Sequence, residues 1–161
     1  LVVTADAKGG EMDTIVVGVD GSEGGLLALE AAVEEAALRN ASLRVVTAWE
    51  MPPAVVAGFA YDSGYYQQTM REAKQHAVDI ATKALARVAE LQPSLPCEKR
   101  VVEGHQAKVI LEEAKDAIRI VVGARGHGGF AGLLLGSVSQ QVVGHAHCPV
   151  LVVPPRVAES A

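Results

Sequence analysis

Long apolar runs, clustered basic side chains and cysteines are all scarce in this chain of 161 residues. Its longest apolar runs fall far short of the roughly 18 residues that a membrane-spanning helix needs, so we expect no membrane span. Adjacent basic residues occur only at Lys99-Arg100, and the net charge is −5. Because binding to nucleic-acid phosphates needs clustered cations, we expect no nucleic-acid partner. Cys97 and Cys148 are too few for a disulfide framework and suit a reducing cytoplasm.

The composition and length of the chain are those of one globular domain. Half of the residues are apolar and a fifth are charged, which is typical of a soluble protein. A chain of this length can bury a single core. Residues 1–13 lack the charged and apolar regions of a secretion signal and are expected to form a flexible lead-in, and residues 155–161 a flexible tail. The sequence therefore predicts one cytoplasmic domain over residues 14–154.

Apolar β-branched runs alternate with segments of helical spacing along the chain. The run at 14–20 is continuous rather than alternating, as expected of a strand covered on both faces. We expect strands at 14–20, 42–50, 97–102, 117–122 and 148–153 and helices at 23–39, 67–91, 106–116 and 137–145. Strands that alternate with helices predict an α/β fold, with a parallel sheet between two helical layers.

The expected helices show apolar stripes that mark their inward faces. The first helix should begin after Ser22 as its N-cap and end at Asn40. Its stripe consists of Leu26, Leu29, Val33 and Ala36. The stripe of the long helix runs from Met70 to Leu91 and is expected to be core. A loop over residues 51–64 separates this helix from the second strand and is longer than most connections.

A glycine-rich stretch from Ile120 to Ser137 joins the fourth strand to the last helix. It contains Gly123, Gly126, Gly128, Gly129, Gly132 and Gly136. Glycine lets backbone N–H groups approach a ligand, and the first turn of a helix adds unpaired N–H donors at the positive end of its dipole. The stretch therefore predicts a phosphate site, in which Ser137 either caps the helix or bonds a phosphate oxygen. The alternative is an ordinary loop between a strand and a helix.

In parallel α/β sheets, ligands bind beyond the carboxyl ends of the strands, where the strand order switches. Asp20 and Gly123 end the first and fourth strands and are expected to flank this crevice, with Gly18 and Val19 beside Asp20. The alternative role of Asp20 is to stabilise its Asp-Gly-Ser turn. Arg125 either neutralises phosphate charge or extends into solvent.

Competing motifs are incomplete. The run from Gly126 to Ala131 imitates a dinucleotide fingerprint, but it lies in the last crossover and no acid is placed for a ribose. The chain has no Gly-Lys-Ser/Thr of a Walker P-loop, and the serines after Gly136 lack the Gly-x-Ser-x-Gly of serine hydrolases. His145, His147 and Cys148 could suggest a soft-metal site, although a histidine at a helix end is the simpler interpretation.

The spacing Gly123-x2-Gly126-x9-Gly136-Ser137 resembles the ATP-binding signature of the universal stress protein family. The first strand with its Asp-Gly-Ser turn and the last strand are also similar to that family, so the resemblance covers about residues 14–154. It implies a five-stranded parallel sheet in the order 3-2-1-4-5 with four helices, of the adenine nucleotide alpha hydrolase-like type. It also implies a bound ATP, with Mg²⁺ or Mn²⁺ as a companion.

The resemblance assigns roles to individual positions of this chain. It implies that Asp20 contacts the ribose or base, that the backbone of Ala48 meets adenine and that Gly123 lines the ribose. The phosphates would be held by Gly126, Gly136 and Ser137. The amides of Val138 and Ser139 would lie in the same first helical turn and join them.

The resemblance also implies a homodimer formed through the last strand, whose apolar edge needs cover. The edge residues are Val150, Leu151, Val152 and Val153. The expected function is an ATP-binding regulatory module of the stress response. The alternatives are a slow ATPase, or a member that binds cyclic AMP or no nucleotide and acts through protein–protein contacts. Hydrolysis needs a positioned water and strong charge neutralisation, for which Arg125 and His127 are the candidates.

Overall fold

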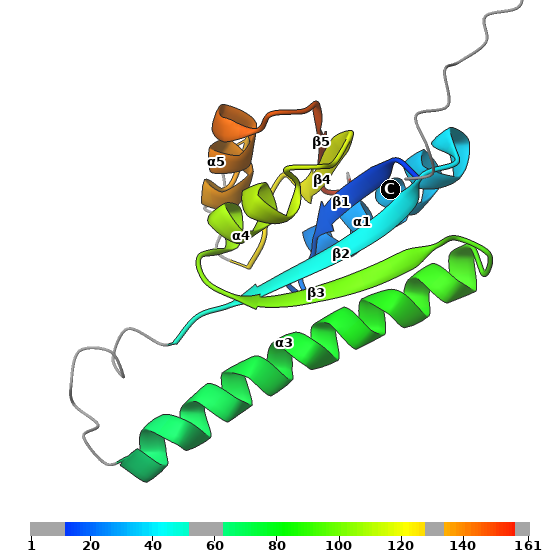
Figure 1. Ribbon diagram of the computed structural model, residues 1–161. Coiled ribbons are helices and arrows are strands. Elements are labelled where there is room, and N and C mark those ends of the chain that lie inside the picture. Colours follow the sequence, from blue (N-terminus) through cyan, green and yellow to red (C-terminus); the bar gives the residue numbers. More distant parts are fainter. Residues whose placement is uncertain (1–11, 52–62, 128–133, 157–161) are drawn as a thin grey trace, which may run out of the picture.

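The computed structural model describes residues 12–51, 63–127 and 134–156. Its elements are β1 (Thr14–Gly18), α1 (Glu23–Arg39), β2 (Ser42–Trp49), α3 (Ser63–Leu91), β3 (Cys97–Glu103), α4 (Gln106–Glu113), β4 (Arg119–Gly123), α5 (Ser137–His145) and β5 (Val150–Val153) (Figure 1). The predicted alternation of strands and helices is confirmed. Most of the predicted lead-in, of the tail and of the 51–64 loop lies outside the described residues, as do Gly128, Gly129 and Gly132.

The five strands form one sheet in the order β3-β2-β1-β4-β5, and every neighbouring pair is parallel. The expected order 3-2-1-4-5 is therefore confirmed. The central strand β1 pairs with β2 on one side and with β4 on the other, so that Val17 lies between Val45 and Val121. The chain thus reverses its direction of winding between β1 and β4, which places a crevice at the carboxyl ends of these two strands.

Successive residues of β1 belong to two separate cores, one on each face of the sheet. Ile15 and Val17 pack in a core that includes residues of α1 and α3. Val16 packs in the other core, with Ile110 of α4 and Val142 of α5. All five side chains are at most 1% exposed. The continuous apolar run of β1 is explained by this burial on both faces, as predicted.

The inward faces of two helices differ from the predicted stripes. In α1 the prediction for Leu26 is wrong, because this side chain is 45% exposed while Ala28 and Ala32 are fully buried. These small residues let the helix approach the sheet closely, so its buried face is rotated away from Leu26. In α3 the core stripe ends before Leu91, the last residue of the helix, which is 40% exposed.

The helix ends of α1 follow the sequence signals. The hydroxyl of Ser22 accepts a hydrogen bond from the Gly25 N–H at 3.0 Å, which confirms Ser22 as the N-cap. Asn40 ends the helix in the left-handed conformation at φ 52°. Cys97 and Cys148 are both free. Across the described ranges, no helix is both long and apolar enough to cross a membrane.

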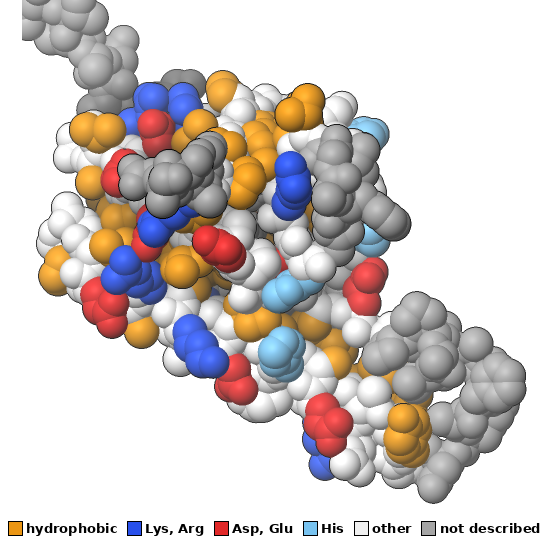
Figure 2. Space-filling model, turned by 180° about the vertical axis from the view of Figure 1, so that it is seen from behind, with side chains coloured by type: hydrophobic (Ala, Val, Ile, Leu, Met, Phe, Trp, Pro, Cys, Tyr) orange, Lys and Arg blue, Asp and Glu red, His pale blue; other side chains and the backbone are white. Residues whose placement is uncertain are grey.

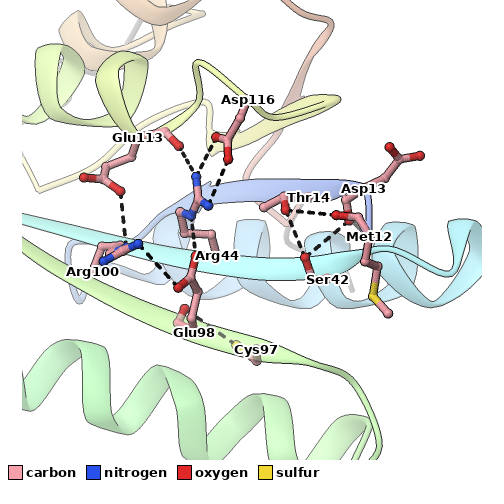
Figure 3. A network of polar contacts seen from close by, with 10 residues as sticks. All are labelled: Met12, Asp13, Thr14, Ser42, Arg44, Cys97, Glu98, Arg100, Glu113 and Asp116. Atoms are coloured by element: carbon pink, nitrogen blue, oxygen red, sulfur yellow. Dashed lines mark hydrogen bonds and ion pairs between the residues drawn. The ribbon is translucent and has the colours of Figure 1, made fainter. Parts of the chain in front are cut away.

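An ion-pair network around Arg44 ties together the amino end of the sheet, away from the crevice (Figure 3). The Arg44 guanidinium bonds Asp116 at 2.7 Å and the backbone carbonyl of Glu113 at 2.6 Å, and it also pairs with Glu98. Arg100 joins Glu98 to Glu113 at 3.6 and 3.5 Å. The hydrogen bond from Arg44 lowers the pKa of the Asp116 carboxyl below its usual value.

Replacement of Asp116 by asparagine is expected to lower stability at pH 7, by about 1 kcal/mol or less because the carboxylate is partly solvated. Since the folded pKa of Asp116 lies below its unfolded value of about 3.9, its contribution is complete above that value and is lost as pH falls through the folded pKa. The stability difference between Asp116→Asn and the parent should therefore shrink between pH 5 and pH 2 in thermal unfolding.

The matched control is Asp79→Asn on the exposed face of α3, where the carboxylate accepts a hydrogen bond from Gln75 and contacts no cation within the described residues. Its stability difference should vary less with pH. A constant difference for Asp116→Asn across the acid range would contradict the role given to the Arg44 pair.

Candidate functional site

A cavity of about 290 Å³, here called the first cavity, opens at the carboxyl end of the sheet between the segments that follow β1 and β4. Its lining includes most of the residues predicted for the site: Gly18, Asp20, Gly123, Arg125, Gly126, Gly136, Ser137, Val138 and Ser139. Val19 and Ala48 do not border it. Val19 is buried in the core on the α1 side, and Ala48 packs on the edge of the other core.

Four further lining residues were not predicted: Gly25, Gln106, Ile110 and Val122. His127, considered from the sequence only for hydrolysis, also lines the first cavity. Gln106 and Ile110 belong to α4, whose first turn reaches the cavity from the crossover between β3 and β4. No local signal in the sequence marks them, because their position depends on where that crossover lands on the sheet.

The carboxylate of Asp20 stabilises its own turn, which was the alternative role considered from the sequence, and Asp20 also borders the first cavity. Its Oδ1 accepts hydrogen bonds from the N–H and the hydroxyl of Ser22, which fixes the turn before α1. Its Oδ2 lies on the cavity side, where a Cβ added to Gly126 would come within 2.5 Å of it. His127 Nε2 donates to the backbone carbonyl of Asp20 at 2.9 Å. The turn after β1 is therefore linked directly to the segment after β4.

The first turn of α1 presses against the segment that follows β4. A Cβ on Gly24 would lie 2.1 Å from the carbonyl oxygen of Arg125, and one on Gly123 would lie 2.6 Å from the carbonyl oxygen of Gly24. Both contacts are with backbone, so no side chain can turn aside to make room. The adjacent glycines inside a helix, Gly24 and Gly25, were the available signal, since helical glycine usually has a packing reason.

The start of α5 forms one wall of the cavity. Gly136 is its N-cap, with φ −77° and ψ 171°, and Ser137 is the first helical residue, as predicted. Of the two roles considered for Ser137, that of N-cap is therefore wrong. No side chain in the described ranges caps this turn. The first N–H groups of a helix have no partner within it, and those of Ser137, Val138 and Ser139 belong to residues that line the cavity.

The hydroxyl of Ser139 is used for structure. It is 2% exposed and lies 2.9 Å from the carbonyl oxygens of both Ala124 and Gly136, which accept its hydrogen bond. The N–H of Gly136 also donates to Ala124, at 2.7 Å. These bonds fasten α5 to the end of β4. Only the backbone amide of Ser139 remains for a ligand.

Arg125 is a cationic side chain that lines the first cavity and pairs with no described carboxylate. Its Nε is buried and has no hydrogen-bond partner in the described part of the chain. No described carboxylate lies within ion-pairing distance of its guanidinium, whereas many other arginines of the chain are paired. A buried cationic donor without a partner is costly, so this side chain is suited to an anion.

Together, these groups combine donors with an apolar wall. Backbone amides at the start of α5 and the Arg125 side chain supply donors, and Ile110 and Val122, which lie near Gly18, supply apolar surface. Such a cavity can hold a molecule with an anionic end and an apolar, flat end. The described residues include no cluster of three or more potential metal ligands. His145 instead contacts the carbonyl of Gln141 at 2.9 Å within its own helix.

Comparison with known proteins decides the family. The model of the Universal stress protein family matches residues 11–154. This chain belongs to the universal stress protein family. The resemblance drawn from the glycine spacing is thereby confirmed. A universal stress protein of Mycobacterium tuberculosis is 35% identical over 152 residues, which cover 87% of this chain and 47% of the relative. The chain thus spans about half the length of the curated relatives it matches.

Solved structures of the family share the fold. UspA of Lactobacillus plantarum superposes with a TM-score of 0.74 at 24% identity, covering 89% of this chain and 99% of that one. A universal stress protein solved in complex with cAMP gives a TM-score of 0.65 at 28% identity, with coverage of 89% and 98%. These likenesses confirm the open five-stranded fold expected for the family.

Proposed function

We propose that this chain binds ATP in the first cavity and acts as a regulatory module whose conformation or contacts respond to the nucleotide. The observation that carries the proposal is Arg125. Among the described residues, its buried Nε has no hydrogen-bond partner and no side chain caps the adjacent first turn of α5. Amide N–H groups, the positive end of a helix dipole and a guanidinium converge there, which is an arrangement suited to phosphate. Similarity to a family member solved with cAMP supports an adenine nucleotide as the ligand class.

In this proposal the phosphates lie against Arg125, Gly126 and the α5 wall of Gly136 to Ser139. At Gly136 an added Cβ would find its nearest contact, a carbonyl oxygen, at 3.5 Å. An added methyl group would thus be in ordinary van der Waals contact, and a glycine here has no side chain to cover the neighbouring amides. ATP would bring Mg²⁺ or Mn²⁺ with it, since such ions are commonly held by substrate phosphates, water and one or two carboxylates.

The nucleoside is expected on the β1 side of the cavity. The Oδ2 of Asp20, which no described residue bonds, can accept a hydrogen bond from a ribose hydroxyl, and Gly123 remains the residue expected to line the ribose. The adenine would lie against Ile110 and Val122. Contact of the Ala48 backbone with adenine and of Val19 with the nucleotide remain predictions, since neither residue borders the first cavity.

A regulatory role is favoured over ATP hydrolysis by the hydrogen bonds that Asp20 and His127 already make. Asp20 Oδ1 is occupied by Ser22, and His127 Nε2 is bonded to the Asp20 carbonyl. These bonds occupy one carboxylate oxygen of Asp20 and one ring nitrogen of His127, whereas hydrolysis needs a group that positions a water. A slow ATPase is the alternative, and rapid Mg²⁺-dependent turnover that disappears in His127→Ala would favour it.

Titration calorimetry with ATP, ADP and cyclic AMP tests the proposal. Arg125→Gln is expected to weaken ATP binding by about tenfold or more, because a charge-assisted contact to phosphate is lost. The matched control is Arg71→Gln, at an exposed arginine of α3 that bonds only its own helix among the described residues. Unchanged ATP affinity in Arg125→Gln would refute the placement. Preference for cyclic AMP, or no nucleotide binding at all, would support the two alternatives in turn.

We also propose a homodimer through β5. This strand lies at the edge of the sheet, beyond β4, and all four of its residues are half-buried: Val150, Leu151, Val152 and Val153. An apolar edge strand with unpaired backbone groups invites pairing with a second copy.

A further inference from the structure

A second cavity, of about 410 Å³, lies between α1 and α3, on the sheet face opposite to α4 and α5. Figure 2 views this side of the molecule and shows hydrophobic and histidine side chains along the hollow beside the long helix. The volume is within the range of ordinary small-molecule pockets, about 300–1,000 Å³. The proposed nucleotide site does not use this cavity, although Asp20 and His127 border both.

The floor of the second cavity is apolar. It is formed by Val19 and Leu29, which are almost fully buried, and by the partly buried Ile80. Leu26 completes it with 45% of its surface exposed, because α1 turns this side chain away from the sheet and into the cavity. A ligand that covers the exposed surface of Leu26 removes this apolar surface from water, which favours binding.

The α3 side of the rim carries nitrogen donors. His76, Lys83 and Arg87 follow one another on the face of α3 that lines the cavity. Arg87 is already paired with Glu30 at 2.8 Å and Glu90 at 3.2 Å. For Lys83 and His76, by contrast, no hydrogen bond or ion pair is present within the described ranges. These two groups are therefore available to a ligand.

Two carboxylates also border the cavity, and their positions decide the expected charge of the ligand. The Asp20 carboxylate is held by Ser22 and faces Gly126 in the first cavity. Glu23 is exposed in the first turn of α1, where it complements the helix dipole. Neither lies within 4 Å of Lys83. The ammonium group of Lys83, on the α3 side of the cavity, is therefore not neutralised by either carboxylate.

We propose that the second cavity binds a small carboxylic acid with an apolar alkyl chain. The carboxylate of this ligand pairs with Lys83 and His76, and its alkyl chain covers Leu26 and Ile80. This inference is independent of nucleotide binding in the first cavity.

Octanoate is the probe, with octanol and octylamine as matched molecules of neutral and positive charge. In titration calorimetry, octanoate is expected to bind once per chain and about tenfold more tightly than octanol. Lys83→Gln should lower the affinity for octanoate about tenfold and leave the affinity for octanol unchanged. Leu26→Gln should lower the affinity for both ligands, because it removes apolar surface from the floor of the second cavity.

Two control variants separate this site from others. Lys74→Gln changes an exposed lysine of the same helix outside the cavity, and Arg125→Gln changes the cation of the first cavity. Both should bind octanoate like the parent protein. The proposal is overturned if octanoate does not bind, if Lys83→Gln binds it unchanged, if octylamine binds more tightly, or if Arg125→Gln removes the binding.

Discussion

Gly126→Asp is expected to abolish ATP binding, with a loss of about 100-fold or more in affinity. A Cβ at this position would lie 2.5 Å from Asp20 Oδ2, so Asp20 or the segment after β4 must move. The new carboxylate would also stand beside the Asp20 carboxylate and in the proposed phosphate position, where like charges repel. Because Gly126 is exposed, the strain falls on a surface segment and the domain should remain folded. Calorimetry gives the affinity, and thermal unfolding checks the fold.

Two further variants test whether the loss of ATP affinity in Gly126→Asp comes from its position and from its charge. Gly144→Asp makes the same change on α5, where an added Cβ meets nothing within 4 Å, and should bind ATP like the parent. Gly126→Ala introduces the steric conflict without the charge, so its loss should be smaller than that of the aspartate. ATP binding by Gly126→Asp at parental affinity would show that the phosphates do not lie at this segment.

Gly24→Ala is expected to destabilise the domain by about 1–3 kcal/mol, the usual range for overpacking a tight contact. The added methyl group would lie 2.1 Å from the carbonyl oxygen of Arg125. Since the obstacle is backbone, α1 and the segment after β4 must separate. The same movement displaces Arg125 and Gly126, so weaker ATP binding should accompany the lower stability. Urea denaturation measures the first effect and calorimetry the second.

The control for this variant has the opposite sign. Gly144→Ala lies inside α5 with open space around it, and it should stabilise the domain by about 0.5–1 kcal/mol through better helix propensity. If Gly24→Ala were also stabilising, the close packing of α1 against the segment after β4 would not exist in solution.

Periodicity and end signals along the chain were enough to predict the alternation of strands and helices, whereas the strand order was implied by the family resemblance. The apolar run of β1 indicated burial on both faces, and Ser22 and Asn40 marked the ends of α1. These signals are local, because side-chain periodicity and helix caps depend on neighbours within a few residues. The start of α3 at Ser63 and the end of α4 at Glu113 each differ by a few residues from prediction, since helix ends carry weaker signals.

The glycine spacing likewise predicted much of the first cavity, from Gly123 to the start of α5. The predicted helix at 137–145 coincides with α5, but the role of N-cap considered for Ser137 is wrong, because the cap is the residue before it, Gly136. Serine suits a cap by its hydroxyl group, and sequence signals do not distinguish the cap from the first helical residue.

The sequence by itself determined the α/β alternation, the parallel sheet and the glycine segment beside a helix start. Only the tertiary structure decided that Ile110 closes the first cavity, that Gly24 touches the Arg125 carbonyl and that Arg125 lacks a partner among the described residues. It also decided that Leu26 faces a second cavity. These features join segments far apart in the chain, and their meeting depends on how each crossover packs on the sheet rather than on any local pattern.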